Sequence, residues 1–308
     1  MLETRPARRS RAAPRFGDLL ALTRPLHAVK SVLLVPVALI DTPSWTAHEL
    51  GAIGWAVVVF SLAAACVYVA NDIIDRDRDR RHPVKRHRPV AAGQVSVRAG
   101  MLYCATLLTL LGVLVATAPG GPYWPVLGYL ALNLAYVRGL KHVPLLDIGT
   151  VAIGFVLRVV QGYVSVGRPV SAWLVVAVLS VSLLLLIGKR RHELTAAGLA
   201  HRPALRGYSP ELINQLLPIT GMLAVVAGLI YLSSDALLGA YHRVAVLLSA
   251  PFALFLLFRY LQVLVVRQGG GDPLRMMLRD RVMVVAVALW FGGLAVLLML
   301  ARSAVMAS

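Results

Sequence analysis

Acidic residues are scarce in this chain: only 14 of its 308 residues are Asp or Glu, against 31 Lys or Arg. Its two cysteines, Cys66 and Cys104, stand alone in apolar stretches, which excludes a disulfide framework and a thiolate metal site. No short-period repeat marks a solenoid. No stretch between the apolar runs is long enough for a sizeable soluble domain.

Hydrophobic residues are abundant, at 58% of the chain, and the mean hydropathy is +0.75. A transmembrane helix needs about 20 mainly apolar residues, and the apolar runs here are continuous rather than alternating, so they favour helices over a closed barrel. We predict an all-α polytopic membrane protein, with a disordered basic arm at 1–16 and a single integral membrane domain at 17–308. The nine predicted spans are 26–41, 51–71, 97–117, 122–138, 144–166, 170–188, 211–233, 244–266 and 281–302.

The net charge of +17 invites a nucleic-acid interpretation, but the distribution of the charge favours a topological one. Lys and Arg gather in the N-terminal arm and after every second predicted span. This alternation is the positive-inside pattern of membrane proteins. It predicts a cell-membrane protein with a cytoplasmic N-terminus, an external C-terminus and no nucleic-acid partner.

The acids that do occur are concentrated: four of the 14 lie within residues 72–79. Asp72, Asp75 and Asp79 recur at spacings of three and four, which places them on one face of a helix. Acids at a helix C-terminus oppose the helix dipole, so this pattern needs a reason. Oxygen ligands suit Mg²⁺, and the pattern predicts a Mg²⁺–diphosphate site formed by Asn71 and these three aspartates. The alternative is a solvated helix end paired with nearby arginines.

Basic residues follow the aspartates at once and recur after the sixth predicted span. They either anchor cytoplasmic loops at anionic lipid headgroups or bind phosphate. Glu193, in the second group, is either functional or part of a local ion pair. Asp147 and Arg158 lie inside a predicted span, where ionisable residues are costly and suggest function. We predict that Asp147 orients Lys141 or Lys189, and we leave a structural role for Arg158 open.

The order of these motifs resembles the UbiA superfamily of membrane prenyltransferases. Asn71-Asp72-x-x-Asp75-x-x-x-Asp79 is similar to its first Asp-rich motif, and several further segments resemble the decaprenyl-phosphate phosphoribosyltransferase branch. These are 79–93 with His82-Pro83, Leu140-Lys141-His142, Gly154-Phe155 with Arg158, Gly188-Lys189-Arg190 with Glu193, Gly207-Tyr208-Ser209, and Asp272-Pro273 with Asp280-Arg281. The chain departs from the branch at His27-Ala28, Lys30-Ser31 and Arg191.

The resemblance implies nine helices around a lipid-open central cavity whose polar end faces the cytoplasm. It also implies Mg²⁺-dependent transfer of 5-phosphoribose from phosphoribosyl pyrophosphate to a polyprenyl phosphate. Asp72, Asp75 and Asp79 would be catalytic, and with Asn71 they would hold the metal. The substrate-binding residues would be Lys30, Arg80, Lys85, Arg86, Arg88, Lys141, Arg158, Lys189, Arg190, Glu193 and Tyr208.

Within this set, Lys85, Arg86 and Arg88 are expected to bind the donor, and Lys189 and Arg190 the lipid phosphate. Two alternatives stay open. An aromatic prenyltransferase of the same superfamily would use a prenyl diphosphate, but residues 189–193 are basic where that branch has a second Asp cluster. A transporter of a phosphorylated lipid would be favoured by paired inverted repeats, which we do not find in the sequence. The sequence leaves the oligomeric state open.

Overall fold

The computed structural model describes residues 15–25, 29–42, 45–81, 84–118, 121–197, 203–266 and 273–307. Most of the predicted N-terminal arm lies outside these ranges. The sequence motifs at His27, His82-Pro83 and Asp272 also lie outside the described residues.

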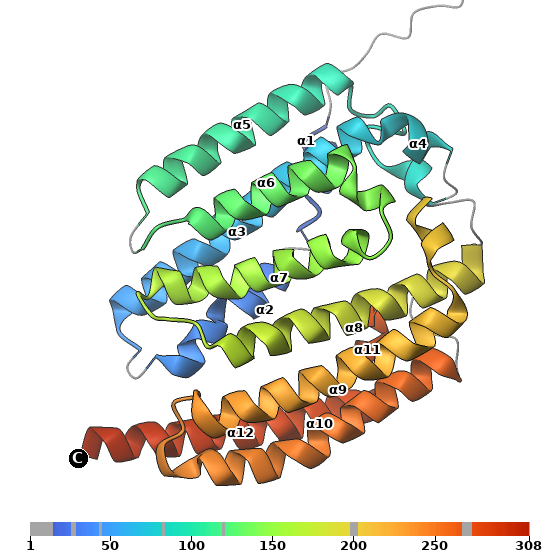
Figure 1. The fold of residues 1–308 in the computed structure, drawn as a ribbon. Coiled ribbons are helices and arrows are strands. Elements are labelled where there is room, and N and C mark those ends of the chain that lie inside the picture. Colours follow the sequence, from blue (N-terminus) through green and yellow to red (C-terminus); the bar gives the residue numbers. More distant parts are fainter. Residues whose placement is uncertain are drawn as a thin grey trace, which may run out of the picture. The chain divides into compact units, whose positions relative to one another are not determined.

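Every regular element in the described ranges is a helix (Figure 1). The α-helices are α1 Phe16–Thr23, α2 Val29–Leu34, α3 Ala47–Ile74, α4 Arg76–Arg80, α5 Val97–Ala116, α6 Trp124–Arg138, α7 Leu146–Ser165, α8 Ala172–Ala197, α9 Pro210–Ser234, α10 His242–Val265, α11 Pro273–Arg279 and α12 Arg281–Ala307. Short 3₁₀ helices are η2 Val35–Asp41, η3 Lys85–His87, η4 Leu140–His142, η6 Pro203–Gly207 and η7 Gly239–Tyr241.

Seven of these helices are long and apolar enough to cross a membrane. They are α3, α5, α7, α8, α9, α10 and α12, and each matches a predicted span. The sequence-based prediction of an all-helical integral membrane protein is therefore confirmed.

The other two predicted spans are shorter helices. α6 has 15 residues. The stretch predicted as one helix at 26–41 is broken into the six-residue α2 and the seven-residue η2. Pro36, in the first turn of η2, has no N–H to continue the ladder of α2, so a single continuous helix there is a wrong prediction.

The chain forms two compact units. Unit 1 contains residues 1–28 and 62–114, and unit 2 contains residues 29–61 and 115–308. The described part of unit 1 comprises α1, the C-terminal half of α3, α4, η3 and α5. At the start of α5, a Cβ on Gly100 would lie 3.3 Å from the Ile73 side chain of α3, so a small residue permits this close approach.

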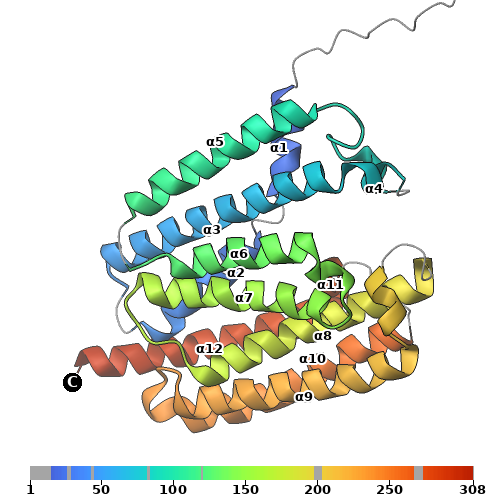
Figure 2. The same ribbon diagram turned by 45° about the horizontal axis from the view of Figure 1, so that its top comes forward.

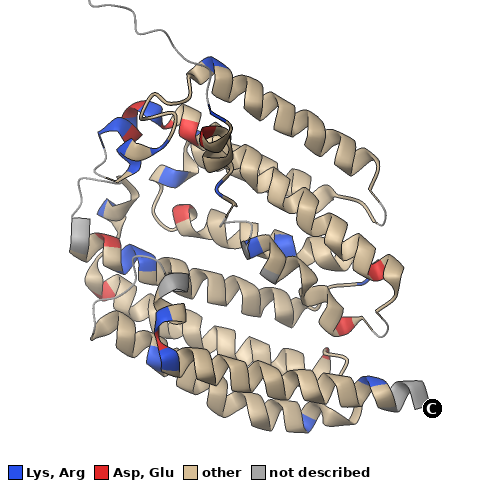
Figure 3. Cartoon of the chain, turned by 180° about the vertical axis from the view of Figure 1, so that it is seen from behind, with Lys and Arg blue, Asp and Glu red and all other residues tan. Residues whose placement is uncertain are grey.

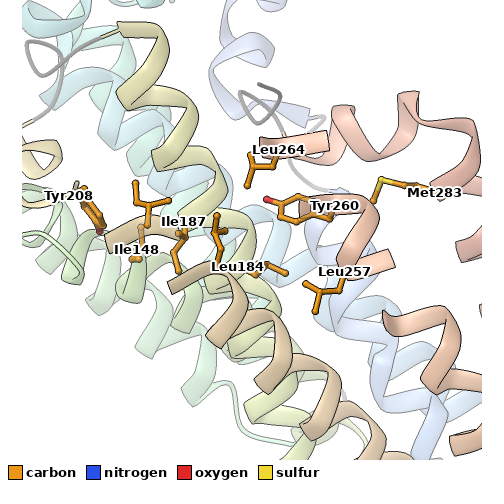
Figure 4. Packing of buried hydrophobic residues seen from close by; sticks show 10 residues of the cluster. Ile148, Leu184, Ile187, Tyr208, Leu257, Tyr260, Leu264 and Met283 are labelled. Atoms are coloured by element: carbon orange, nitrogen blue, oxygen red, sulfur yellow. The ribbon is translucent and has the colours of Figure 1, made fainter. Parts of the chain in front are cut away.

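In unit 2, the successive helices from α6 to α10 pack on one another (Figures 1 and 2). α7 packs between α6 and α8, α9 packs against α8 and α10, and α12 packs against α10. One core cluster joins Ile148 of α7, Leu184 and Ile187 of α8, Tyr260 of α10 and Met283 of α12 (Figure 4). Gly188 allows α8 to approach the Tyr260 ring, because any Cβ there would collide with the Tyr260 hydroxyl.

Charged residues lie mainly at helix ends and connections, and the long helices are otherwise nearly free of them (Figure 3). One predicted boundary is wrong in an informative way. The sixth predicted span ends at residue 188, but α8 continues to Ala197. Lys189, Arg190 and Glu193 therefore lie on a helix rather than in a loop.

Candidate active site

The aspartates of unit 1 lie where α3 ends at Ile74 and α4 begins at Arg76. Between the two helices, Asp75 adopts φ −86° and ψ 5°. Its N–H still donates to the Asn71 carbonyl at 2.9 Å, and the Asp79 N–H donates to the Asp75 carbonyl at 2.8 Å. Because these hydrogen bonds keep the helical register through the bend, Asp72 and Asp79 stay close together, and both are only 2% exposed.

Two arginines neutralise these carboxylates. Arg88 Nη1 lies 2.6 Å from Asp79 Oδ2 and 3.3 Å from Asp72 Oδ1, so one guanidinium bridges both acids. Arg24 Nη2 also donates to Asp72 Oδ1, and its guanidinium stacks over the Tyr68 ring, 5.0 Å from the centroid. We call Asn71, Asp72, Asp75, Asp79, Arg24 and Arg88 the aspartate cluster.

Arg24 is the member that sequence reasoning missed, since it counted only as part of the basic N-terminal charge. It ends α1 with a left-handed backbone, φ 50° and ψ 65°. Such a conformation is uncommon outside glycine and is often found at functional sites. In the sequence, the position of Arg24 beside Pro25 was the one feature that could have marked it as a member of the site.

The oxygen atoms of the aspartate cluster indicate whether it could bind a cation. Asn71 Oδ1 is buried and has no hydrogen-bond partner in the structure, so this amide, which directly precedes Asp72 in the chain, offers an unused acceptor. Among the described residues, no group of three or more His, Cys, Asp or Glu is arranged to hold a metal ion. Mg²⁺ usually takes only one or two protein carboxylates and completes its shell with water and substrate phosphates. The amide oxygen of Asn71 and the carboxylates of Asp72 and Asp79 are therefore of the chemical type that suits Mg²⁺.

Asp75 stands apart from the two buried acids. Its side chain is 25% exposed and lies 4.0 Å from Arg78. Although the predicted spacing is present, the Asp75 side chain is thus less buried than those of Asp72 and Asp79. A role as a metal ligand stays a prediction for Asp75.

The basic run after α4 divides into different environments. Arg80 Nε donates to the Ala91 carbonyl at 3.1 Å and so fastens the loop that carries Arg88. Lys85 and Arg86 are exposed on η3. Arg88, in the same run, contacts both buried aspartates.

Unit 2 contains a second set of charged and polar side chains, which we call the arginine network: Asp147, Arg190, Glu193 and Tyr208. Asp147 and Arg190 are buried, whereas 27% of the Glu193 side chain is exposed. Arg190 Nε donates to Asp147 Oδ2 at 2.9 Å, and Arg190 Nη1 pairs with Glu193 one turn later on α8. Only 3% of the Arg190 side chain is exposed. Glu193 thus forms the local ion pair that was one of its two predicted roles, and Asp147 orients Arg190.

Tyr208 completes the network. Its hydroxyl donates to Asp147 Oδ1 at 2.6 Å and accepts the Leu145 N–H at 2.9 Å. Burial and the hydrogen bond to Asp147 raise the pKa of Tyr208, so the hydroxyl stays protonated. Leu145 has φ 66° and ψ −43°, and the Leu146 N–H donates to the Pro144 carbonyl at 2.8 Å. This is a strained γ-turn, held at its centre by Tyr208.

Arg158 lies in α7 among aromatic rings rather than carboxylates. It is 4% exposed and lies 5.0 Å from the Phe60 centroid, 4.7 Å from that of Tyr129 and 5.6 Å from that of Phe155. Its Nη1 donates to the Gly154 carbonyl at 2.6 Å. Lys30 Nζ lies 5.3 Å from the same Phe155 ring. The aromatic rings and the Gly154 carbonyl are the partners of Arg158 that the sequence did not identify.

The remaining predicted residues, Lys141 and Lys189, also belong to unit 2. Lys141 lies on η4 and is 9% exposed, whereas Lys189 on α8 is half-buried. Lys189 directly precedes Arg190, so the arginine network fixes the turn of α8 that carries it.

Comparison with known proteins identifies the class. Residues 32–279 match the UbiA prenyltransferase family. A solved UbiA homolog from Archaeoglobus fulgidus, bound to DMAPP and Mg²⁺, superposes with a TM-score of 0.66 at 20% identity, covering 93% of this chain and 99% of that one. The chain belongs to the UbiA prenyltransferase family, and its fold is the UbiA fold.

Relatives with more specific names cover most of the chain. The decaprenyl-phosphate phosphoribosyltransferase of Mycobacterium tuberculosis is 33% identical over 87% of this chain and 89% of its own length. The protein of the same name from Corynebacterium glutamicum is 32% identical over 87% of this chain and 82% of its own length.

Proposed function

We propose that this protein transfers 5-phosphoribose from phosphoribosyl pyrophosphate to a polyprenyl phosphate and releases pyrophosphate. The observation that carries the proposal is near-full-length similarity to phosphoribosyltransferases of decaprenyl phosphate. The geometry supports it, because both compact units contain buried arginine–carboxylate clusters at positions that sequence motifs had singled out.

The donor's pyrophosphate is assigned to the aspartate cluster. Asn71, Asp72 and Asp79 would hold Mg²⁺, with Asp75 as a further candidate ligand. The metal, when bound, supplies Lewis-acid stabilisation of the leaving pyrophosphate. Arg24 and Arg88 lie against the same carboxylates, and about a quarter of each side chain is exposed. They are therefore placed to donate to phosphate oxygens as well, which arginine does with two parallel hydrogen bonds.

The acceptor's phosphate is assigned to Lys189. Arg190 was predicted to share this role, but its guanidinium is buried between Asp147 and Glu193. We therefore assign Arg190 to holding α8 in place while Lys189 contacts the ligand. The acceptor is already an anion, so its attack on the ribose C1 needs no strong general base. Positioning and electrostatics then carry the catalysis.

The membrane topology follows the charge pattern. We propose nine spans, counting α6 and the broken segment 29–41, around a lipid-open cavity for the polyprenyl chain. The N-terminus and the aspartate cluster would face the cytoplasm, and the C-terminus would lie outside, as the positive-inside rule predicts.

The decisive experiment is mass spectrometry of lipid products made by the purified protein with Mg²⁺, phosphoribosyl pyrophosphate and polyprenyl phosphates of several lengths. A product gaining one phosphoribosyl group supports the proposal. In parallel, a prenyl diphosphate is offered with a phenolic acceptor. Turnover only in that second reaction would assign the protein to aromatic prenylation. Flux of a phosphorylated lipid into proteoliposomes without conversion would indicate a transporter instead.

A further inference from the structure

An exposed face of unit 2 carries a groove that the proposed function does not use. It has a volume of about 500 Å³ and lies on α10 and α12. Apolar side chains line it, among them Phe252 and Phe255 of α10 and Val285 and Leu289 of α12. Val285 and Leu289 remain 56% and 61% exposed. Because both helices are candidate membrane spans, the groove offers an acyl chain the surface that it prefers.

One end of the groove is basic. Arg281, the first residue of α12, is the charged residue of its lining. Arg279 lies two positions earlier, and both side chains are exposed. Neither guanidinium pairs with a carboxylate among the described residues.

The acid between these two arginines is engaged elsewhere. Asp280 Oδ2 accepts from Arg259 Nε and Nη2 at 3.1 and 2.8 Å, which joins α10 to α12. Asp280 Oδ1 accepts the N–H groups of Val282 and Met283 at the start of α12. Burial opposes ionisation, but these hydrogen bonds outweigh it and keep the pKa of Asp280 below its usual value. The Asp280 carboxylate thus binds Arg259 and the N-terminus of α12. Within the part of the chain that the structure describes, it forms no ion pair with Arg279 or Arg281 beside the groove.

We propose that this groove is a binding site for an anionic phospholipid, with one acyl chain along α10 and α12 and the phosphate on Arg281 and Arg279. An apolar groove with basic residues at one end complements a chain attached to a negative headgroup. Arginine also suits phosphate geometry, and basic residues at the membrane surface attract anionic lipids. The occupant is a structural lipid, distinct from the polyprenyl phosphate substrate.

The test compares lipid retention in variants of the full-length protein. The protein is purified from nanodiscs of phosphatidylcholine with or without phosphatidylglycerol, and bound lipid is counted by native mass spectrometry. Arg279→Ala with Arg281→Ala should weaken phosphatidylglycerol retention about tenfold. Val285→Trp, which fills the groove and leaves the charge intact, should reduce it similarly. The matched control is Arg243→Ala, which removes an exposed charge near the other end of α10.

Phosphoribosyl transfer measured on the same preparations separates this site from the proposed function. Continued transfer by the variants, with lipid retention lost, supports a separate lipid site. Equal retention of phosphatidylglycerol by all variants overturns the proposal. So does displacement of phosphatidylglycerol by polyprenyl phosphate, which would make the groove part of the acceptor site. Thermal unfolding of each variant checks that lost retention does not reflect a lost fold.

Discussion

The aspartate cluster and the arginine network use the same residue types in two different ways. In the network, Arg190 is 3% exposed and lies between two carboxylates, while Tyr208 uses Asp147's second oxygen. In the cluster, Arg24 and Arg88 are 23% and 25% exposed, and Asn71 Oδ1 lacks a partner. A buried guanidinium held between two carboxylates specifies a structure, whereas partly exposed guanidinium groups beside an unused acceptor can bind a ligand. The contrast predicts that variants in the two regions will fail in opposite ways.

The largest expected effect is on catalysis. Asp72→Asn should lower transfer activity about a thousandfold, because it weakens the hold on the metal that stabilises the leaving pyrophosphate. Its fold should survive, because Arg24 and Arg88 reach solvent and Arg88 keeps Asp79. Initial rates at saturating substrates measure the activity, and thermal unfolding in detergent measures the stability of the fold. Asp77→Asn is the matched control, since Asp77 is an exposed acid in the same segment. Near-normal turnover by Asp72→Asn would remove the metal assignment.

The second prediction concerns stability. Asp147→Ala should cost about 3–5 kcal/mol, because it leaves Arg190 buried with one partner fewer. Combining Asp147→Leu with Arg190→Met should cost less than the sum of the single variants, since it removes both charges together. Denaturation midpoints of the two single variants and the double variant give this coupling. Additive losses would mean that the pair contributes no coupling to the fold.

The sequence predicted the local part of both regions. The spacing of Asp72 and Asp79 was sufficient to expect them on one side of a helix, and the apolar runs were sufficient to expect membrane helices. The long-range partners were not predictable. Arg24 lies 48 residues from Asp72, and Tyr208 lies 61 residues from Asp147. No pattern in the chain encodes which distant arginine or tyrosine reaches a buried acid.

Two smaller features also needed the structure. The bend at Asp75, between α3 and α4, interrupts a segment whose charge spacing predicts a continuous helix. The prediction that Arg190 binds phosphate came from its neighbours in sequence, whereas its burial comes from α8 continuing to Ala197 with Asp147 beside it.

The third prediction tests the separation of roles on α8. Lys189→Ala should raise the KM for polyprenyl phosphate about tenfold, through the loss of one charged hydrogen-bond donor. The KM for phosphoribosyl pyrophosphate should stay unchanged. Steady-state kinetics with each substrate varied gives the two values, and Arg206→Ala on the exposed surface of η6 is the control. A raised donor KM with an unchanged acceptor KM would reverse the assignment of the two phosphates.

The fourth prediction uses the unused acceptor. Asn71→Ala should change stability little, because its Oδ1 has no partner to lose, and alanine suits a helix. It should raise the Mg²⁺ concentration for half-maximal activity at least about tenfold. It should also reduce the rise in Tm on Mg²⁺ addition, which reports binding without catalysis. An unchanged Mg²⁺ dependence would leave Asn71 outside the metal site.

The smallest expected effect concerns the strained turn that Tyr208 holds. Leu145 has φ 66° in a γ-turn, and its side chain is half exposed, so Leu145→Gly loses little packing and relieves backbone strain. It should therefore stabilise the protein by up to about 1 kcal/mol, although glycine's greater freedom when unfolded offsets part of this gain. Leu145→Ala keeps the strain and is the matched control. Equal Tm values for the two variants would show that the strain at Leu145 is no larger than the entropic cost of glycine, and a lower Tm for Leu145→Gly would contradict the prediction.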